Sequence, residues 1–379
     1  MASKSFLICT YSAGYGHHKV SQAIREALLA VDPGAAVHIA DPWKHGSPRL
    51  NDLLNNVYLK MLKRGPSIYR TLYTRAENAE RAGKRSLAGS IFWRLLTGKL
   101  FCFRLDALIA SARPSVIICV HPFAALAVSR WKAWKRAEFP PVTGVITDFT
   151  VHPYWAQSEL DGYFVASHEF KLELAKRGVP WNKIWTSGIP VGAKFTLSLN
   201  KLSVRSELGL DLHHKTVLVM GGGLGLGDLH EVVECIGKSG LPVQTIVVTG
   251  RNKVLQDKLA DLIQGVKAPV KVFGFVDNIP ELMSASDIIV TKPGGVTVAE
   301  ALAARLPILV WRPIPGQEER NTSFVVSRQL GAHVRGSAEL MEKLRQLIEA
   351  GPGNDFELAV LQRLAARNVA CIVRESYTT

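Results

Sequence analysis

The stretch CTYSAGYGHHKVSQAI, residues 9–24, places two histidines directly after a glycine turn. An apolar run from Phe6 to Cys9 precedes the turn and a helical pattern follows it, as in nucleotide-binding α/β proteins. It is not a G-x-G-x-x-G dinucleotide loop, because Lys19 stands where the third glycine is required. Histidine titrates near neutral pH, so this turn carries side chains suited to moving a proton.

A second glycine turn lies in IIVTKPGGVTVAEALAARLPILVW, residues 288–311, between a strand that ends at Lys292 and a helix. Unpaired backbone N–H groups and the helix dipole make such a helix start a site for a diphosphate. Glu300, one turn into the helix, can accept hydrogen bonds from the two hydroxyls of a ribose. The residues expected at the diphosphate are Gly294, Gly295, Val296 and Thr297.

Two neighbouring segments supply the other parts of a nucleotide-sugar site. RPIPGQEERN, residues 312–321, is expected to be a loop whose amide and carboxylate groups meet sugar hydroxyls. VFGFVDNIP, residues 272–280, ends a strand where exposed backbone can pair with a uracil edge. The candidates here are Gln317, Glu318 and Asn321 for the sugar and Phe275 and Val276 for the base.

Further groups are expected near the diphosphate. MGGGLGLGD has no G-x-G-x-x-G register, which argues against a nicotinamide site and for a loop whose backbone contacts phosphate. The candidates are Gly222 and Gly223 for backbone contacts and Lys292 and Arg251 for added positive charge.

Short apolar runs alternate with helical patterns through both halves of the chain, which predicts doubly wound parallel sheets. We expect an α/β protein of two Rossmann-like domains facing a cleft, with ligands outside the carboxyl ends of the strands. The expected strands are 5–10, 36–40, 115–120, 142–147 and 162–167, then 217–223, 244–250, 270–275, 287–292 and 307–311. The expected domains are 1–195 and 196–355, with a helix in 356–379 that returns to the first.

Charge is concentrated in one segment. The formal net charge is +14, and residues 42–104 hold 13 Lys and Arg against 3 acids, or 13 − 3 = +10. Aromatic residues at helical spacing accompany the basic ones, which favours an amphipathic insertion resting on an anionic bilayer over one packed on its own domain. A second basic cluster, SRWKAWKRAEF, surrounds two tryptophans. The aromatic candidates for membrane contact are Tyr58, Tyr69, Tyr73, Trp131 and Trp134.

Several classes of protein are disfavoured. The five cysteines are scattered without a C-x-x-C pair, which indicates free thiols and not a disulfide frame or zinc site. There is no run of about 18 apolar residues. No nucleic-acid motif accompanies the charge, so no nucleic-acid partner is expected.

The motifs as a set, GFVDNIPELMSASDIIVTKPGGVTVAEALAARLPIL and PGQEERN with SAGYGHHKVSQAI and VITDFTVHPYW, resemble one family of glycosyltransferases. That family contains monogalactosyldiacylglycerol synthase and the processive diacylglycerol glucosyltransferases. The resemblance runs along nearly the whole chain and implies the GT-B fold, inverting chemistry, a UDP-sugar donor and a diacylglycerol acceptor. No cofactor or metal is expected, since none of the 13 aspartates forms the D-x-D pair that binds metal in other glycosyltransferases.

The resemblance gives the first turn a role. Gly16 lets the backbone approach the donor, and His17 is expected to accept the proton of the acceptor hydroxyl as it attacks the anomeric carbon. Asp148 is the rival base or the orienting partner of His17, and His152 and Trp155 are expected to shape the acceptor entrance. His121 at another strand end is assigned to neither cleft nor core.

The expected activity is transfer of glucose or galactose from a UDP-hexose to diacylglycerol, giving a β-glycolipid. The expected place is the cytoplasmic face of the cell membrane or an organelle membrane like the inner envelope, on an anionic phospholipid surface. Three alternatives stay open: a UDP-N-acetylglucosamine transferase with a polyprenyl-linked acceptor, a UDP-sugar 2-epimerase, and a basic nucleic-acid-binding protein.

Overall fold

The computed structural model describes residues 4–11, 15–42, 99–135, 139–350 and 356–377. The chain divides into two compact units. Unit 1 comprises residues 1–193, 315–317 and 364–379, and unit 2 comprises 194–314 and 318–363. Among the described residues, no helix is both long and apolar enough to span a bilayer.

Unit 1 is built on a parallel sheet of six strands in the order β2-β1-β3-β4-β5-β6. Strands β3, β4 and β5 are buried along their whole length, which explains their continuous apolar sequences. The strands are β1 (Ser5–Cys9), β2 (Ala36–Ala40), β3 (Val116–Cys119), β4 (Val142–Val145), β5 (Gly162–Val165) and β6 (Ile184–Thr186). The described helices are α1 (Tyr15–Val31), α5 (Lys99–Ala112), α6 (Pro122–Lys135), α7 (Pro153–Gln157) and α8 (His168–Lys176), with the 3-10 turn η1 (Trp181–Lys183).

The last helix, α16 (Phe356–Tyr377), begins in unit 2 and ends in unit 1. Asn368 Nδ2 donates to the main-chain oxygen of Ser187 at 3.4 Å. At the end of the helix, the hydroxyl of Tyr377 donates to the main-chain oxygen of Asp161 at 3.1 Å. A Cβ on Gly162 would lie 2.2 Å from that hydroxyl, so glycine is required where the helix ends on β5.

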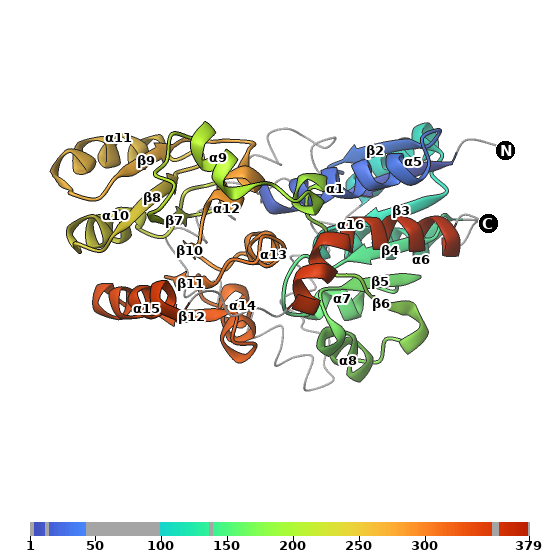
Figure 1. The fold of residues 1–379 in the computed structure, drawn as a ribbon. Coiled ribbons are helices and arrows are strands. Elements are labelled where there is room, and N and C mark those ends of the chain that lie inside the picture. Colours follow the sequence, from blue (N-terminus) through green and yellow to red (C-terminus); the bar gives the residue numbers. More distant parts are fainter. Residues whose placement is uncertain (1–3, 12–14, 43–98, 136–138, 351–355, 378–379) are drawn as a thin grey trace. The chain divides into compact units, whose positions relative to one another are not determined.

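Unit 2 holds a second parallel six-stranded sheet, in the order β12-β11-β10-β7-β8-β9 (Figure 1). Its strands are β7 (Lys215–Met220), β8 (Val243–Val248), β9 (Val270–Phe273), β10 (Ile288–Thr291), β11 (Ile308–Trp311) and β12 (Gly331–Val334). Its helices are α9 (Lys201–Glu207), α10 (Leu229–Lys238), α11 (Lys253–Leu262), α12 (Ile279–Ala285), α13 (Gly295–Ala303), α14 (Gln317–Ser327) and α15 (Ser337–Ala350), with 3-10 turns η2 (Ala193–Thr196) and η3 (Ile263–Gly265).

One face of this second sheet carries a continuous apolar core. Side chains of α10, α11 and α15 pack on β7, β8, β10 and β11 in a single cluster that includes Trp311. Numbered from β7, the strand order is the 3-2-1-4-5-6 order of dinucleotide-binding folds. The order reverses between β7 and β10 in unit 2 and between β1 and β3 in unit 1. Ligands of such sheets bind outside the carboxyl ends of the strands at these switch points.

The expected α/β architecture of two doubly wound domains is confirmed. All ten expected strands are present, most of them a residue or two shorter than expected. Two strands were missed, β6 and β12.

Candidate functional site

One candidate site lies at the switch point of unit 1, after β1, β3 and β4. Helix α1 begins at Tyr15, so His17 lies in its first turn. Nδ1 of His17 is 3.0 Å from the main-chain oxygen of Val120, which follows β3, and 3.1 Å from Oγ1 of Thr147, which follows β4. Three segments that are far apart in the sequence therefore meet at one imidazole.

The contact with Val120 fixes the tautomer of His17. A carbonyl oxygen can only accept a hydrogen bond, so Nδ1 carries the proton and donates it. In the neutral ring Nε2 then holds a lone pair, which is the form a general base needs.

The surroundings of His17 keep the ring neutral. Burial lowers its pKa to about 4, although the hydrogen bond to Val120 acts in the opposite direction. The positive end of the α1 dipole also disfavours a charged imidazole in the first turn. At neutral pH His17 is thus an unprotonated base.

A second imidazole packs against the first. The ring of His121 lies edge-on to that of His17, with centroids 4.6 Å apart, and is 6% exposed. Its Nδ1 accepts the backbone N–H of Phe123 at 3.1 Å, so the proton of the neutral ring is on Nε2. Burial, with His17 and His152 nearby, holds the pKa of His121 well below its usual value. His121 lies at the site and not in the remote core.

The loop after β4 holds the other candidates of unit 1. Thr147 is the residue whose hydroxyl reaches His17, while the half-buried Asp148 follows it. The role of Asp148 as base or orienting group stays a prediction. His152 Nδ1 accepts the backbone N–H of Tyr154 at 3.2 Å and caps the short helix α7.

Trp155 requires a correction. It is 2% exposed, and a Cβ on Gly144 of β4 would lie 2.7 Å from its ring. The indole fills a space against the sheet that only glycine leaves open, so Trp155 is a core residue in this structure and not part of an acceptor entrance.

The tryptophans of α6 differ from each other. Trp131 is 5% exposed and its Nε1 donates to Asp106 at 2.9 Å, which corrects the expectation of a membrane-facing side chain. Trp134 is 64% exposed and stacks on Trp131 with centroids 4.7 Å apart. Tyr58, Tyr69, Tyr73 and the rest of the basic segment 43–98 lie outside the described residues.

Another candidate site lies at the switch point of unit 2. Gly222 follows β7 and Lys292 follows β10, and a Cβ on Gly222 would be 3.7 Å from Cε of Lys292. Gly222 has a φ of +66°, in the left-handed region that favours glycine. The ammonium of Lys292 is therefore held near the turn on which the diphosphate was expected.

Lys292 is paired with a buried carboxylate. Its ammonium contacts Oε1 of Glu318, and Oε2 of Glu318 accepts the backbone N–H of Ile314 at 2.8 Å. The two side chains are only 15% and 11% exposed. Glu318 therefore positions Lys292. The contact of Glu318 with the sugar, which the sequence suggested, stays a prediction.

The residues around Glu318 form a helix and not the expected loop. Gln317, Glu318 and Asn321 lie on α14, with Glu318 and Glu319 in the first turn, where acidic residues stabilise a helix. Asn321 is fully buried and its Nδ2 donates to the main-chain oxygen of Pro293 at 2.9 Å. Its amide group therefore holds the backbone of the glycine turn at Pro293. This buried position corrects the expectation that Asn321 contacts sugar hydroxyls.

The glycine turn opens α13 as the sequence predicts. Gly294 is the N-cap, and as a glycine it has no side chain that could cap the helix, while Gly295 is the first helical residue. The backbone N–H groups of Gly295, Val296 and Thr297 are the first of the helix and have no intrahelical acceptor. Glu300 is half-buried one turn further on. This arrangement suits a diphosphate.

The loops after β7, β8 and β9 pack against one another. The carbonyl of Gly223 accepts the backbone N–H of Arg251 at 3.0 Å. The guanidinium of Arg251 lies 5.1 Å from the centroid of the Phe275 ring, and that ring is 38% exposed. Val276 follows and is half-buried. The expected base and phosphate candidates are hence neighbours at the carboxyl edge of one sheet.

Sequence reasoning missed the two groups that hold His17, the carbonyl of Val120 and the hydroxyl of Thr147. Val120 gives no signal because only its backbone acts, whereas Thr147 adjoins the Asp148 that the sequence singled out. Within the described part of the chain, no group of three His, Cys, Asp or Glu side chains is placed to hold a metal ion.

Each of the two units matches a family of known proteins. Residues 17–191 match the family described as monogalactosyldiacylglycerol (MGDG) synthase, and 216–356 match the glycosyltransferase family 28 C-terminal domain. The processive diacylglycerol β-glucosyltransferase of Bacillus cytotoxicus is 31% identical over 346 residues, 90% of this chain and 85% of that protein.

Solved structures share the fold at lower identity. MurG of Acinetobacter baumannii is 15% identical with a TM-score of 0.62, over 98% of this chain and 99% of that one. UDP-GlcNAc 2-epimerase from Neisseria meningitidis, bound to UDP-GlcNAc, is 16% identical with a TM-score of 0.59 over 98% of each chain.

The two sheets have the GT-B fold, and the family 28 match together with the diacylglycerol glucosyltransferase relative makes the chain a glycosyltransferase. The chain belongs to the family of the processive diacylglycerol β-glucosyltransferases and MGDG synthases. The enzyme class expected from the sequence, a glycosyltransferase, is thereby confirmed.

Proposed function

We propose that the protein transfers a hexose from a UDP-sugar to the free hydroxyl of diacylglycerol, with inversion at the anomeric carbon. The observation that carries the chemistry is the fixed tautomer of His17, whose Nδ1 donates to Val120 and whose Nε2 is a neutral base. The acceptor rests on the name of the relative that is 31% identical over 90% of the chain.

In the reaction, the acceptor oxygen attacks C1 of the hexose and its proton passes to Nε2 of His17. The bond between C1 and the diphosphate oxygen breaks, and UDP leaves with the added negative charge. Attack from the face opposite UDP gives the β-glycoside from an α-linked donor. The charge on the departing UDP needs stabilisation. We assign this role to the candidate site of unit 2, called the donor half below.

That stabilisation comes from backbone and lysine. The first N–H groups of α13 and the dipole of the helix favour an anion at Gly294, and the ammonium of Lys292, which Glu318 positions, is proposed to donate a hydrogen bond to it. Glu300 is proposed to hold the ribose hydroxyls, Phe275 and Val276 the uracil, and Gln317 the sugar. These groups make a divalent metal unnecessary, so the enzyme is proposed to keep its activity in the presence of a chelator.

The acceptor is insoluble in water, so the reaction is proposed to take place on a membrane surface, at the cytoplasmic face. The +10 charge of residues 42–104 supports attraction to anionic lipid, at about 1 kcal/mol per basic residue near the surface. The exposed Trp134, beside Lys135, is the described aromatic residue best placed for an interfacial contact.

The test is an assay of the purified protein with UDP-glucose or UDP-galactose, diacylglycerol and anionic vesicles, with products separated by thin-layer chromatography. We expect a glycolipid that forms in EDTA and whose yield falls when anionic lipid is omitted. No glycolipid with either donor would overturn the proposal. Conversion of a UDP-sugar to its 2-epimer without lipid would instead favour the epimerase alternative.

A further inference from the structure

A pocket of about 490 Å³ lies at the other edge of the unit 2 sheet, away from the donor half. Lys215, which lines it, is the first residue of β7, and Ile288 is the first of β10. The strands are parallel, so this edge holds their amino ends, whereas Gly222 and Lys292 follow their carboxyl ends. A ligand here is distinct from the nucleotide-sugar.

The charge of the pocket is strongly unbalanced. Five cationic side chains line it, against a single lining carboxylate, Asp287, and one of the five, Lys194, is paired at 2.7 Å with Glu281, which does not line it. The cationic residues are Lys194, Lys201, Lys215, Arg305 and Arg363.

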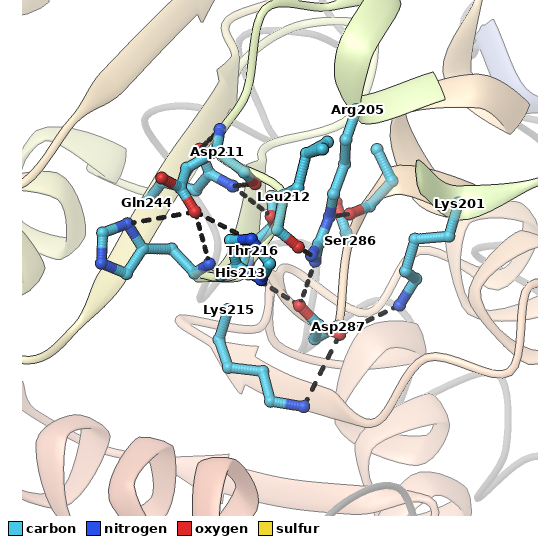
Figure 2. A network of polar contacts seen from close by, with 12 residues as sticks. Lys201, Arg205, Asp211, Leu212, His213, Lys215, Thr216, Gln244, Ser286 and Asp287 are labelled. Carbon is cyan, nitrogen blue, oxygen red and sulfur yellow. Dashed lines mark hydrogen bonds and ion pairs between the residues drawn. The ribbon is translucent and has the colours of Figure 1, made fainter. Parts of the chain in front are cut away.

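Asp287 is already occupied by the protein itself. Its Oδ2 contacts Arg205 at 2.5 Å and the backbone N–H of Thr216 at 2.7 Å, and its Oδ1 contacts Lys201 at 3.0 Å (Figure 2). Burial raises the pKa of Asp287, but these hydrogen bonds outweigh it and leave the pKa below its usual value. The carboxylate is a permanent anion that orders the cations around it.

One charge on Asp287 cannot balance the cations that meet there. Arg205 is 5% exposed and belongs to the core, whereas Lys201 and Lys215 are 41% and 45% exposed and reach Asp287 from different directions (Figure 2). Lys215 is 3.9 Å from the carboxylate, at the limit of an ion pair. Its ammonium can therefore serve a second anion in the pocket.

Two guanidinium groups also line the pocket. Arg363 Nε donates to the main-chain oxygen of Ala303 at the end of α13, which uses one of its five N–H groups. Burial, and then the positive charge of Arg305, lower the pKa of Arg363. Like charges brought together in a partly buried place favour an anion that neutralises both.

We propose that this pocket is a second ligand site, which binds a phosphate group. Phosphate carries up to two negative charges and several acceptor oxygens, matching the guanidinium and ammonium donors. Apolar side chains, among them Leu199, Leu347 and Ile348, line the rest of the pocket and suit the tail of a phosphate-bearing lipid. A free phosphate would use the cations alone.

Isothermal titration calorimetry with the full chain tests the site. Saturating UDP is present throughout, so that phosphate does not report on the donor half. The probes are inorganic phosphate, soluble dihexanoyl phosphatidate and dihexanoyl phosphatidylcholine. The variant Lys215→Gln/Arg363→Gln removes two cations of the pocket. The matched control Lys258→Gln/Arg335→Gln removes two exposed cations that do not line it.

We expect the pocket variant to bind phosphatidate or phosphate at least about tenfold more weakly than wild type, and the control to bind like wild type. Tighter binding of phosphatidate than of phosphate identifies a lipid source, and equal binding a free phosphate. Equal affinity of both variants, or phosphatidylcholine binding as well as phosphatidate, would overturn the site. If Arg363→Gln disturbs folding, Lys215→Gln alone decides, because that side chain is half exposed.

Discussion

His17 and Val120, 103 positions apart in the sequence, are joined by a hydrogen bond of 3.0 Å between the imidazole Nδ1 and a main-chain oxygen. Val120 directly follows β3 and His17 lies just after β1, so the bond crosses the switch point of the first sheet. It presents Nε2 as the basic nitrogen of the ring.

Replacing His17 by Gln removes the base while leaving an amide that can still donate to Val120. We expect kcat to fall by about 10²- to 10⁴-fold, the usual contribution of a general base, with UDP affinity unchanged. Glycolipid formation under saturating donor and calorimetric binding of UDP measure the two quantities.

His18→Gln is the matched control, since that side chain is exposed and contacts Gln22. It should retain wild-type activity. Equal losses in both variants would mean that the helix start, and not the base, had been damaged.

The pH dependence follows from the lowered pKa of His17. A base with a pKa of about 4 stays unprotonated, so the acid limb of kcat/KM should lie near pH 4, and not near the ordinary histidine value of about 6.5. Because this limb lies near pH 4, protonation of His17 should cause almost no change in kcat/KM between about pH 5 and 8. A limb centred near 6.5 would contradict the buried-base assignment.

The same shift affects stability. Between about 6.5 and 4 the unfolded chain binds the proton that folded His17 does not, so the free energy of unfolding decreases as pH falls through this window. His17→Gln should flatten part of that slope in urea unfolding. Another part belongs to His121, whose pKa is lowered in the same direction.

Variants of Lys292 and Glu318 distinguish the effect of the positive charge on UDP binding from the effect of the carboxylate that positions it. Lys292→Met removes the cation and leaves Glu318 buried without it, so UDP binding should weaken at least about tenfold. Glu318→Gln keeps the cation, but its single amide oxygen can accept from Lys292 or from Ile314 and not from both, so UDP binding should weaken by less than in Lys292→Met. Calorimetry with UDP measures both, with the exposed Lys253→Met as control. A larger loss in Glu318→Gln would show that the carboxylate itself contacts the ligand.

Gly250 tests the close packing of the loops around the diphosphate. Its φ is +57° and a Cβ would lie 2.6 Å from the carbonyl oxygen of Gly223. Gly250→Ala should lower the free energy of unfolding by more than about 1 kcal/mol and weaken UDP binding.

Gly240→Ala is the comparison within the same unit, with a φ of +70° and nothing within 4 Å of a Cβ. It carries the backbone strain without the collision. If the two variants lose equal stability, the loop contact contributes nothing.

Period and composition were sufficient to predict the parallel sheets, because continuous apolar runs such as VIIC and IIVT are buried on both faces. They failed at β6 and β12, where IWT is three residues long and GAHV is only partly buried. Such short strands form because a neighbouring strand offers hydrogen-bonding groups, which a local pattern does not show.

The sequence predicted those parts of the site that depend on local backbone structure. It missed those that depend on how side chains pack in the fold. The PGG turn predicts a helix start from the local sequence alone, and α13 begins there. In contrast, QEERN is polar enough to suggest a loop, although its two glutamates suit the first turn of α14. Trp155 and Trp134 are both tryptophans near polar residues, yet one is 2% and the other 64% exposed. The space that Gly144 leaves open against the sheet is filled by Trp155, and this packing is not visible in the local sequence.

The contact of Tyr377 with Gly162 affects the order in which the two units fold during translation. Residues 364–377 emerge after the whole of unit 2, so β5 and β6 must wait for their covering helix while the second sheet is already being completed. The first domain to begin is therefore the last to finish. A nascent chain stopped at Arg363 would leave Trp185 and the edge around Asp161 exposed to water.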